Sequence, residues 1–135
     1  MREILFRGKS ADNGEWLYGM PFKTHIGIFI VYEENPHYCG QYGYMEIDGL
    51  GKVDPDTISQ YTGLKDKSGK KIFEGDIAQI GHSNKLAYLV FEEYQWIFKM
   101  PNLPSWRHRL ENNSAKYKIV GNIWDNPELL KEAET

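Results

Sequence analysis

The stretch QYTGLKDKSGKKIFEGDI, residues Gln60–Ile77, decides the fold. It contains a polar turn at Asp66–Gly69 and a short return through Lys71–Phe73. A turn of this kind commonly places its glycine in the left-handed backbone conformation, as in a β-hairpin. A second polar turn at Glu74–Gly75 precedes a further predicted strand at Asp76–Ile80. The stretch therefore predicts short strands joined by tight turns.

The rest of the chain repeats this organisation on both sides of that stretch. The Asn-Gly pair at Asn13–Gly14 is a strong hairpin signal. Pro21 is expected to end one strand, and Pro101 and Pro104 break the later pattern. Further strands are predicted at Glu3–Arg7, Glu15–Met20, Ile26–Tyr32, Tyr44–Ile47, Ile58–Leu64, Leu86–Phe91, Trp96–Met100 and Tyr117–Trp124.

Two of these regions carry more specific expectations. Both faces of Ile26–Tyr32 are largely apolar, so this strand is expected to be central in its sheet. Residues 33–52 hold Pro36, four glycines and three tyrosines, and we expect a long loop that ends in the short strand near Tyr44.

Helix signals are few. Asp54 as a cap and Pro55 at the first position predict a short helical turn. Asn126, Pro127 and Glu128 predict the start of a short C-terminal helix, about Pro127–Ala133, because the carboxylate lies near the positive end of the helix dipole. The predicted fold is mainly β, a small barrel or packed half-barrels with a short C-terminal helix. An α+β fold with an added helix in residues 50–60 is the alternative.

Size and composition limit the classes of protein. A chain of 135 residues fits a single domain, 1–135. Its single cysteine, Cys39, excludes an internal disulfide. No apolar run approaches a signal peptide core or the roughly 18 residues of a membrane span, so we expect a cytoplasmic protein. The net charge of −3 argues mildly against nucleic-acid binding, which usually needs a basic stripe.

Three segments together resemble the YopX family of phage and prophage proteins, mostly of Gram-positive bacteria. They are FRGKSADNGEWLYG (6–19), QYTGLKDKSGKKIFEGDI (60–77) and IVGNIWDNPELL (119–130), in the expected order along the chain. The stretches 36–52 and 82–116 carry no matching motif. The resemblance implies a phage or prophage origin, a bacterial host cytoplasm and a mostly β fold, and it carries over no catalytic residue.

The residues themselves predict no catalytic, metal or cofactor site. No two histidines are three or four residues apart, the spacing at which metal ligands share a helical face. His37 and Cys39 could share a strand face, but further ligands are missing nearby. The acidic residues that cluster in sequence each have a local role as a cap, turn or solvated residue; they are Asp54, Asp56, Asp66, Glu74 and Asp76.

The most suggestive surface residues form two basic groups. Trp106 with Arg107, His108 and Arg109 could stack on a base and neutralise phosphate, or anchor a protein interface. It could equally be a loop that covers the core with its tryptophan. The second group interleaves with acidic residues and consists of Lys65, Lys67, Lys70 and Lys71.

Three functions remain open. The first is a non-enzymatic accessory protein that acts by protein contacts, as a homo-oligomer with a phage or host protein as a further partner. The sequence supports this function through its four Trp, nine Tyr and six Phe, because one small core cannot easily bury all of them and exposed aromatic residues favour interfaces. The second is a small nucleic-acid-binding barrel that uses Lys65–Lys71 and Trp106–Arg109. The third is an enzyme whose site is assembled from distant residues.

Overall fold

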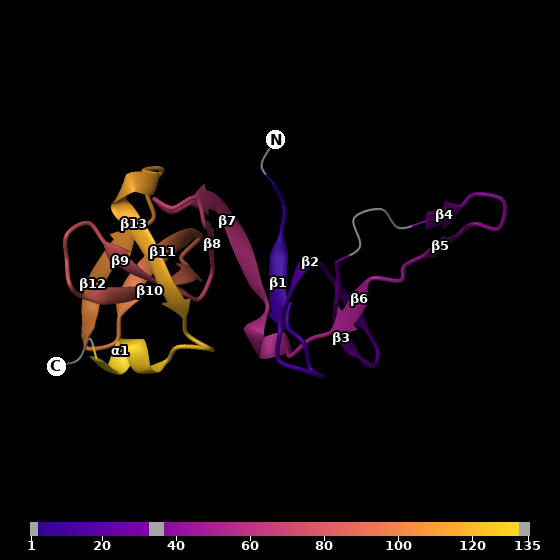
Figure 1. Ribbon diagram of the computed structural model, residues 1–135, viewed down its shortest axis with the longest axis horizontal. Coiled ribbons are helices and arrows are strands. Elements are labelled where there is room, and N and C mark those ends of the chain that lie inside the picture. Colours follow the sequence, from indigo (N-terminus) through magenta and orange to yellow (C-terminus); the bar gives the residue numbers. More distant parts are fainter. Residues whose placement is uncertain (1–2, 33–36, 133–135) are drawn as a thin grey trace. The chain divides into compact units, whose positions relative to one another are not determined.

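The computed structural model describes residues 3–32 and 37–132, which fold mainly as β-strands (Figure 1). By backbone contacts the chain divides into two compact units. Unit 1 is Glu3–Gln60, and unit 2 begins at Tyr61. The predicted mainly β class is confirmed. This division describes where backbone contacts are dense and does not test whether the chain folds as one domain, so the single domain 1–135 stays a prediction.

Unit 1 is built on an antiparallel sheet with the strand order β6-β3-β2-β1, followed by the first residues of β7. A 3₁₀ turn at Pro55–Thr57 precedes β7, and its cap Asp54 accepts a hydrogen bond from the Asp56 N–H, as predicted. Unit 1 has a small core, in which Ile30 and Val53 are the buried apolar residues among those described. The strands are β1 (Phe6–Lys9), β2 (Trp16–Thr24), β3 (Gly27–Val31), β6 (Leu50–Lys52) and β7 (Ser59–Lys65).

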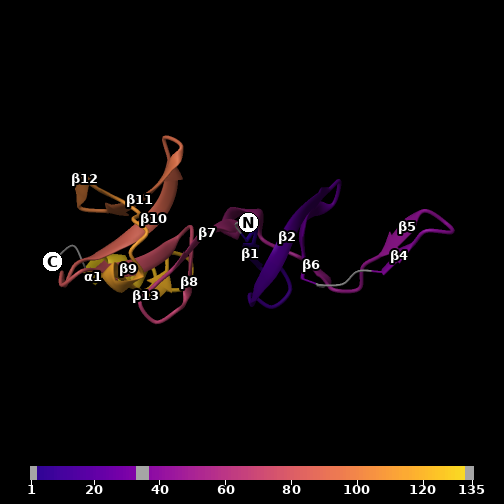
Figure 2. The same ribbon diagram turned by 90° about the horizontal axis from the view of Figure 1, so that it is seen from above.

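Unit 1 also contains a separate two-stranded ribbon. Strands β4 (His37–Cys39) and β5 (Tyr44–Glu46) pair antiparallel and run side by side (Figures 1 and 2). They pair with no other strand in the described part of the chain. The strand predicted near Tyr44–Ile47 is confirmed, whereas β4 and β6 were expected to be loop. Residues 33–36 of that expected loop lie outside the described residues.

Unit 2 is built on an antiparallel sheet of five strands in the order β12-β11-β10-β9-β13. Strand β8 (Lys71–Phe73) pairs with the end of β7 across the predicted hairpin. No described sheet closes into a barrel, and the open sheets agree with the half-barrels of the prediction. The remaining elements are β9 (Asp76–Ile80), β10 (Leu86–Glu92), β11 (Gln95–Met100), β12 (Leu103–Arg109), a 3₁₀ turn at Ser114–Lys116, β13 (Tyr117–Asn122) and α1 (Glu128–Glu132).

The core of unit 2 is much larger than that of unit 1. Along β10 the side chains of Ala87 and Leu89 are buried and alternate with partly exposed neighbours, the pattern of a strand with one face on a core. Partly buried residues, Trp96 and Trp106 among them, pack against the same cluster. The buried cluster consists of Ile72, Ala78, Ala87, Leu89, Phe98, Met100, Tyr117 and Ile119.

Two predictions about prolines are wrong. β2 continues through Pro21, which pairs with Ile30 of β3. Pairing of β2 with β1 ends at Gly19, so at Pro21 the strand has a neighbour on one side only, where the missing N–H is tolerated. Pro104 lies within β12, which is an edge strand and has a register shift beside it at Lys99/Met100. Edges and bulges are where proline is found in sheets.

Strand β3 lies between β2 and β6, so its predicted central place in the sheet is confirmed. Two apolar faces predict a strand that is buried on both sides, but Ile30 is the only one of its five residues that is buried. One face of this sheet therefore stays partly exposed in the single chain.

Candidate functional site

The segment Trp106–Arg109 is the end of strand β12 rather than a loop. Its side chains therefore alternate between the two faces of the sheet. Trp106 and His108 are half-buried, with their rings 6.3 Å apart, and Trp106 packs against the core cluster. Arg107 and Arg109 are exposed. The strand thus separates the tryptophan ring from the two guanidinium groups that were expected to act with it.

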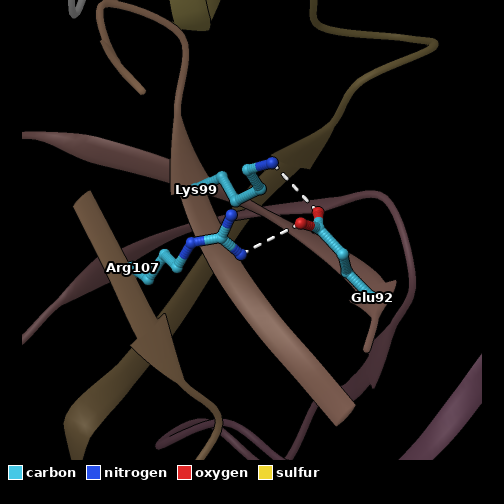
Figure 3. Close-up of polar contacts among 3 residues, drawn as sticks. All are labelled: Glu92, Lys99 and Arg107. Carbon is cyan, nitrogen blue, oxygen red and sulfur yellow. Dashed lines mark hydrogen bonds and ion pairs between the residues drawn. The ribbon is translucent and has the colours of Figure 1, made fainter. Parts of the chain in front are cut away.

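Arg107 belongs to a small ion-pair network that spans three neighbouring strands (Figure 3). Glu92, at the end of β10, accepts a hydrogen bond from Lys99 of β11 at 3.0 Å and one from Arg107 at 3.0 Å. The hydrogen bonds from Lys99 and Arg107 hold the pKa of the Glu92 carboxyl below its ordinary value. One positive charge of the predicted contact segment is therefore already paired with a carboxylate of its own unit.

His108 faces the interior, where it meets Tyr117 of β13. The His108 Nε2 and the Tyr117 hydroxyl lie 3.0 Å apart, and the same hydroxyl accepts the Glu111 N–H at 2.8 Å. Burial lowers the pKa of His108, and the nearby Lys116 charge adds to this effect. Burial likewise raises the pKa of the Tyr117 hydroxyl. This arrangement fastens the edge strand β12 to the core.

The lysines Lys65, Lys67, Lys70 and Lys71 lie on the β7–β8 hairpin of unit 2. Lys65 and Lys71 pair across the two strands, and the turn between them holds the other two. Three of them are exposed, while Lys71 is half-buried with its Nζ 5.6 Å from the Tyr61 ring centroid. The hairpin presents lysines to solvent around a turn that is itself held in place from within.

Asp66 holds this turn, and its burial was not predicted. It is 3% exposed, and one carboxylate oxygen accepts the N–H groups of Ser68 and Lys70 at 2.9 Å. The other oxygen accepts the Ile119 N–H of β13, also at 2.9 Å. Burial raises the pKa of Asp66, but the hydrogen bonds from Ile119, Lys70 and Ser68 outweigh it, so the net shift is downward.

The two basic groups lie on opposite margins of the unit 2 sheet. The hairpin attaches to β13 at one edge, where the Lys67 N–H donates to the Tyr117 carbonyl, and β12 is the other edge. Tyr117 joins them, since its backbone holds the hairpin and its hydroxyl meets His108. Sequence reasoning named both groups and missed Tyr117, which it took only as the start of the last strand.

A surface that sequence reasoning did not single out lies on the sheet of unit 1. Register places two rows of side chains on one face: Met20 beside Val31 and Leu50, and Phe22 beside Phe29 and Lys52. Met20 is 46% exposed and Phe22 is 50% exposed. We call Met20, Phe22, Phe29, Val31 and Leu50 the apolar face. Its sequence signals were the large residues Trp16, Tyr18 and Met20 at alternate positions and the apolar run Ile26–Tyr32.

The β4–β5 ribbon is the second surface of unit 1 with exposed large side chains. Tyr38 is 61% exposed, and Tyr42 in the turn is 69% exposed. The Tyr42 and Tyr44 rings stack at 6.2 Å, and Met45 beside them is also exposed. We call residues 37–46 the tyrosine ribbon. The three tyrosines of the expected loop were the sequence signal for this surface. They showed no strand pattern, so the ribbon itself could not be predicted from them.

Within the described ranges 3–32 and 37–132, no three His, Cys, Asp or Glu side chains group in a way that could hold a metal ion. His37 and Cys39 lie in β4, with Cys39 half-buried and not in a disulfide. Across the same residues, no helix is long and apolar enough to cross a membrane.

Comparison with known proteins gives a family and similar solved structures. The family model described as YopX protein matches residues 5–131, nearly the whole chain. The crystal structure of protein EF1440 from Enterococcus faecalis is similar at 25% sequence identity and a TM-score of 0.65. The similarity covers 96% of this chain and 99% of that one. No curated protein matches the chain.

Proposed function

The chain belongs to the YopX family, and on that premise we propose that it is a phage or prophage accessory protein that acts by protein contacts. It works in the bacterial cytoplasm as a homo-oligomer and without catalysis of its own. Phage or host proteins are its further partners.

The observation that carries this proposal is the unequal distribution of apolar side chains between the units. Unit 1 buries Ile30 and Val53 among its described apolar residues, yet it carries ten of the fourteen large apolar side chains that are exposed in the described residues. An exposed apolar surface rimmed by polar residues marks an interaction site. The exposed large residues of unit 1 are Ile4, Tyr18, Met20, Phe22, Ile26, Tyr32, Tyr38, Tyr42, Tyr44 and Met45, whereas unit 2 has Phe91, Tyr94, Leu103 and Val120.

The nucleic-acid alternative draws less support from the same geometry. Stacking on a base needs an accessible ring, but Trp106 packs against the core of unit 2. Arg107 is engaged by Glu92. Arg109, which is exposed, and the four lysines of the β7–β8 hairpin remain as candidate phosphate-binding residues. If they bind DNA or RNA, the affinity must fall steeply as salt is raised.

Light scattering at micromolar concentration tests the proposal. Self-association predicts a mass that is a multiple of 15.7 kDa and that depends on protein concentration at the dilute end. A mass that stays near 15.7 kDa when the protein is concentrated tenfold would overturn the homo-oligomer. A salt titration of oligonucleotide binding in the same buffer tests the alternative.

A further inference from the structure

The tyrosine ribbon has little to hold it in place within one chain. Its two strands have three residues each and pair only with each other among the described strands. An isolated two-stranded hairpin is marginally stable in water, and three strands or a packing surface are needed to stabilise it. Nearly all its side chains are exposed, with Tyr42 at 69%. The ribbon therefore gains stability from any surface that covers these rings.

The apolar face is a surface of the matching kind. Its five residues form two rows across β2, β3 and β6, with Phe22 and Met20 about half exposed. Aromatic and aliphatic side chains pack well against such a pleated surface. Within one chain the tyrosines of the ribbon stay exposed, and so do Met20 and Phe22 of the face, so the ribbon does not cover these two residues of its own copy.

Charge also matches between the two surfaces. The tyrosine ribbon, residues 37–46, contains Glu46 and no lysine or arginine. Lys52 ends the second row of the apolar face and is exposed. None of the described strand positions on this face of β2, β3 and β6 is acidic. Two copies of the face would bring like charges together, whereas ribbon against face brings opposite charges together.

We infer that the tyrosine ribbon of one copy docks on the apolar face of a second copy, with Glu46 on the side of Lys52. This inference rests on the proposed self-association and names the two surfaces that make it. Tyr38, Tyr42 and Tyr44 supply ring area of the kind that dominates binding at protein interfaces.

Cross-linking from the ribbon tests the contact directly. Cys39 is the only cysteine of the chain and lies in β4, so a maleimide benzophenone attaches there alone. Protein mixed in equal parts from normal and ¹⁵N-labelled cultures distinguishes links between copies from links within one. We expect mixed-isotope links to peptides that contain residues 20–31 or 50–52. Links confined to one isotope, or to other segments, would overturn the inference.

A pair of matched variants tests how much the ribbon contributes to the affinity of self-association, without the cross-linker on Cys39. Tyr42→Ser removes an exposed ring from the ribbon and should raise the dissociation constant about tenfold or more. Tyr94→Ser removes a ring that is 97% exposed in unit 2 and should leave it unchanged. Lys52→Glu should weaken association, and Glu46→Lys added to the same chain should restore it in part, as a double-mutant cycle requires.

These outcomes separate the inference from the proposed function. If the unaltered protein is a monomer, both fail, and the ribbon and face belong to a different partner. If it is an oligomer that tolerates Tyr42→Ser as well as Tyr94→Ser, self-association stands and the ribbon does not carry it.

Discussion

Gly75 shows how one residue can fix the start of a strand. Its φ of +85° is in the left-handed region, its N–H donates to the Leu89 carbonyl, and its carbonyl accepts the Ile123 N–H. A Cβ at this position would collide with the indole ring of Trp124. Both the backbone angle and the lack of space therefore require glycine.

We predict that Gly75→Val destabilises the protein by about 1–3 kcal/mol from backbone strain, and by more once the Trp124 clash is included. Gly75→Ala and Gly69→Ala provide the matched comparison. Gly69 has a similar φ of +83° but open space around it, so it carries the strain without the clash. Urea unfolding should show a larger loss for Gly75→Ala. Equal losses would contradict the role assigned to Trp124.

Asp66 makes the fold sensitive to acid. Its pKa is lower in the folded protein than the ordinary value of 3.8, because three backbone N–H groups outweigh the effect of burial. A carboxyl with a depressed folded pKa stabilises the fold fully above its unfolded pKa, and this stabilisation is lost as the pH falls through the folded pKa. The window of loss therefore begins near pH 4 and extends below it.

Asp66→Asn should cost about 2–3 kcal/mol at neutral pH, since an amide cannot accept all three hydrogen bonds. The variant should also lose less stability than the unaltered protein as the pH falls from about 4 to about 2, because the carboxyl with its depressed pKa titrates in this range. Urea midpoints measured across this range provide the check, with Asp12→Asn at an exposed turn as the control. Parallel pH curves for both variants would show that Asp66 is not the titrating group.

At the scale of elements, β12 divides its residues between structure and surface. Trp106 packs on the unit 2 core and Arg107 pairs with Glu92 on the other face. Trp106→Ala should therefore cost about 2–4 kcal/mol, as large-to-small core substitutions do. Arg107→Ala should cost less than about 1 kcal/mol, the usual range for an exposed ion pair. Urea unfolding of both variants decides the assignment, and similar losses would contradict it.

Elements set by local chemistry could be predicted from the sequence. The bounds of β8 and β9 agree with their predictions, because turn residues mark both ends. The cap and proline before Asp56 gave the 3₁₀ turn for the same reason. In these places the residues that shape the backbone are neighbours in the sequence.

Elements set by distant partners could not be predicted. β6 has three residues, of which the middle one is Gly51, so local propensity does not predict it; it forms because Leu50 pairs with Val31 of β3. β12 was not predicted because Pro104 lies within it. A strand accepts a proline at this position only because β12 is at the edge of its sheet. Of the candidate surfaces, the basic residues could be named from composition. The apolar face could not, since its rows come from the register of three strands.

At the scale of the whole molecule, the two units differ in what stabilises them. Unit 2 buries a cluster that includes Leu89, Phe98 and Tyr117, while unit 1 buries Ile30 and Val53 among its described apolar residues. Regions with few buried apolar contacts open more readily, and a partner that covers them suppresses the opening.

Hydrogen exchange followed by mass spectrometry should show this difference. In dilute protein, amides of β2 and β3 should exchange faster than those of β9 and β10. A higher protein concentration should slow exchange in β2, β3 and the tyrosine ribbon, and leave β9 and β10 unchanged. Uniform protection in both units, or no dependence on concentration, would contradict the proposed role of unit 1.

The order of the units along the chain matters during synthesis. Ribosomes release the N-terminal residues first, and domains generally fold as they emerge. Unit 1 therefore leaves the ribosome before the larger core exists, and its sheet gains β7 only after Gln60 emerges to pair with Phe6. On a polysome, neighbouring nascent chains present the same ribbon and the same apolar face at this moment. We expect copies translated from one messenger to meet before either is complete.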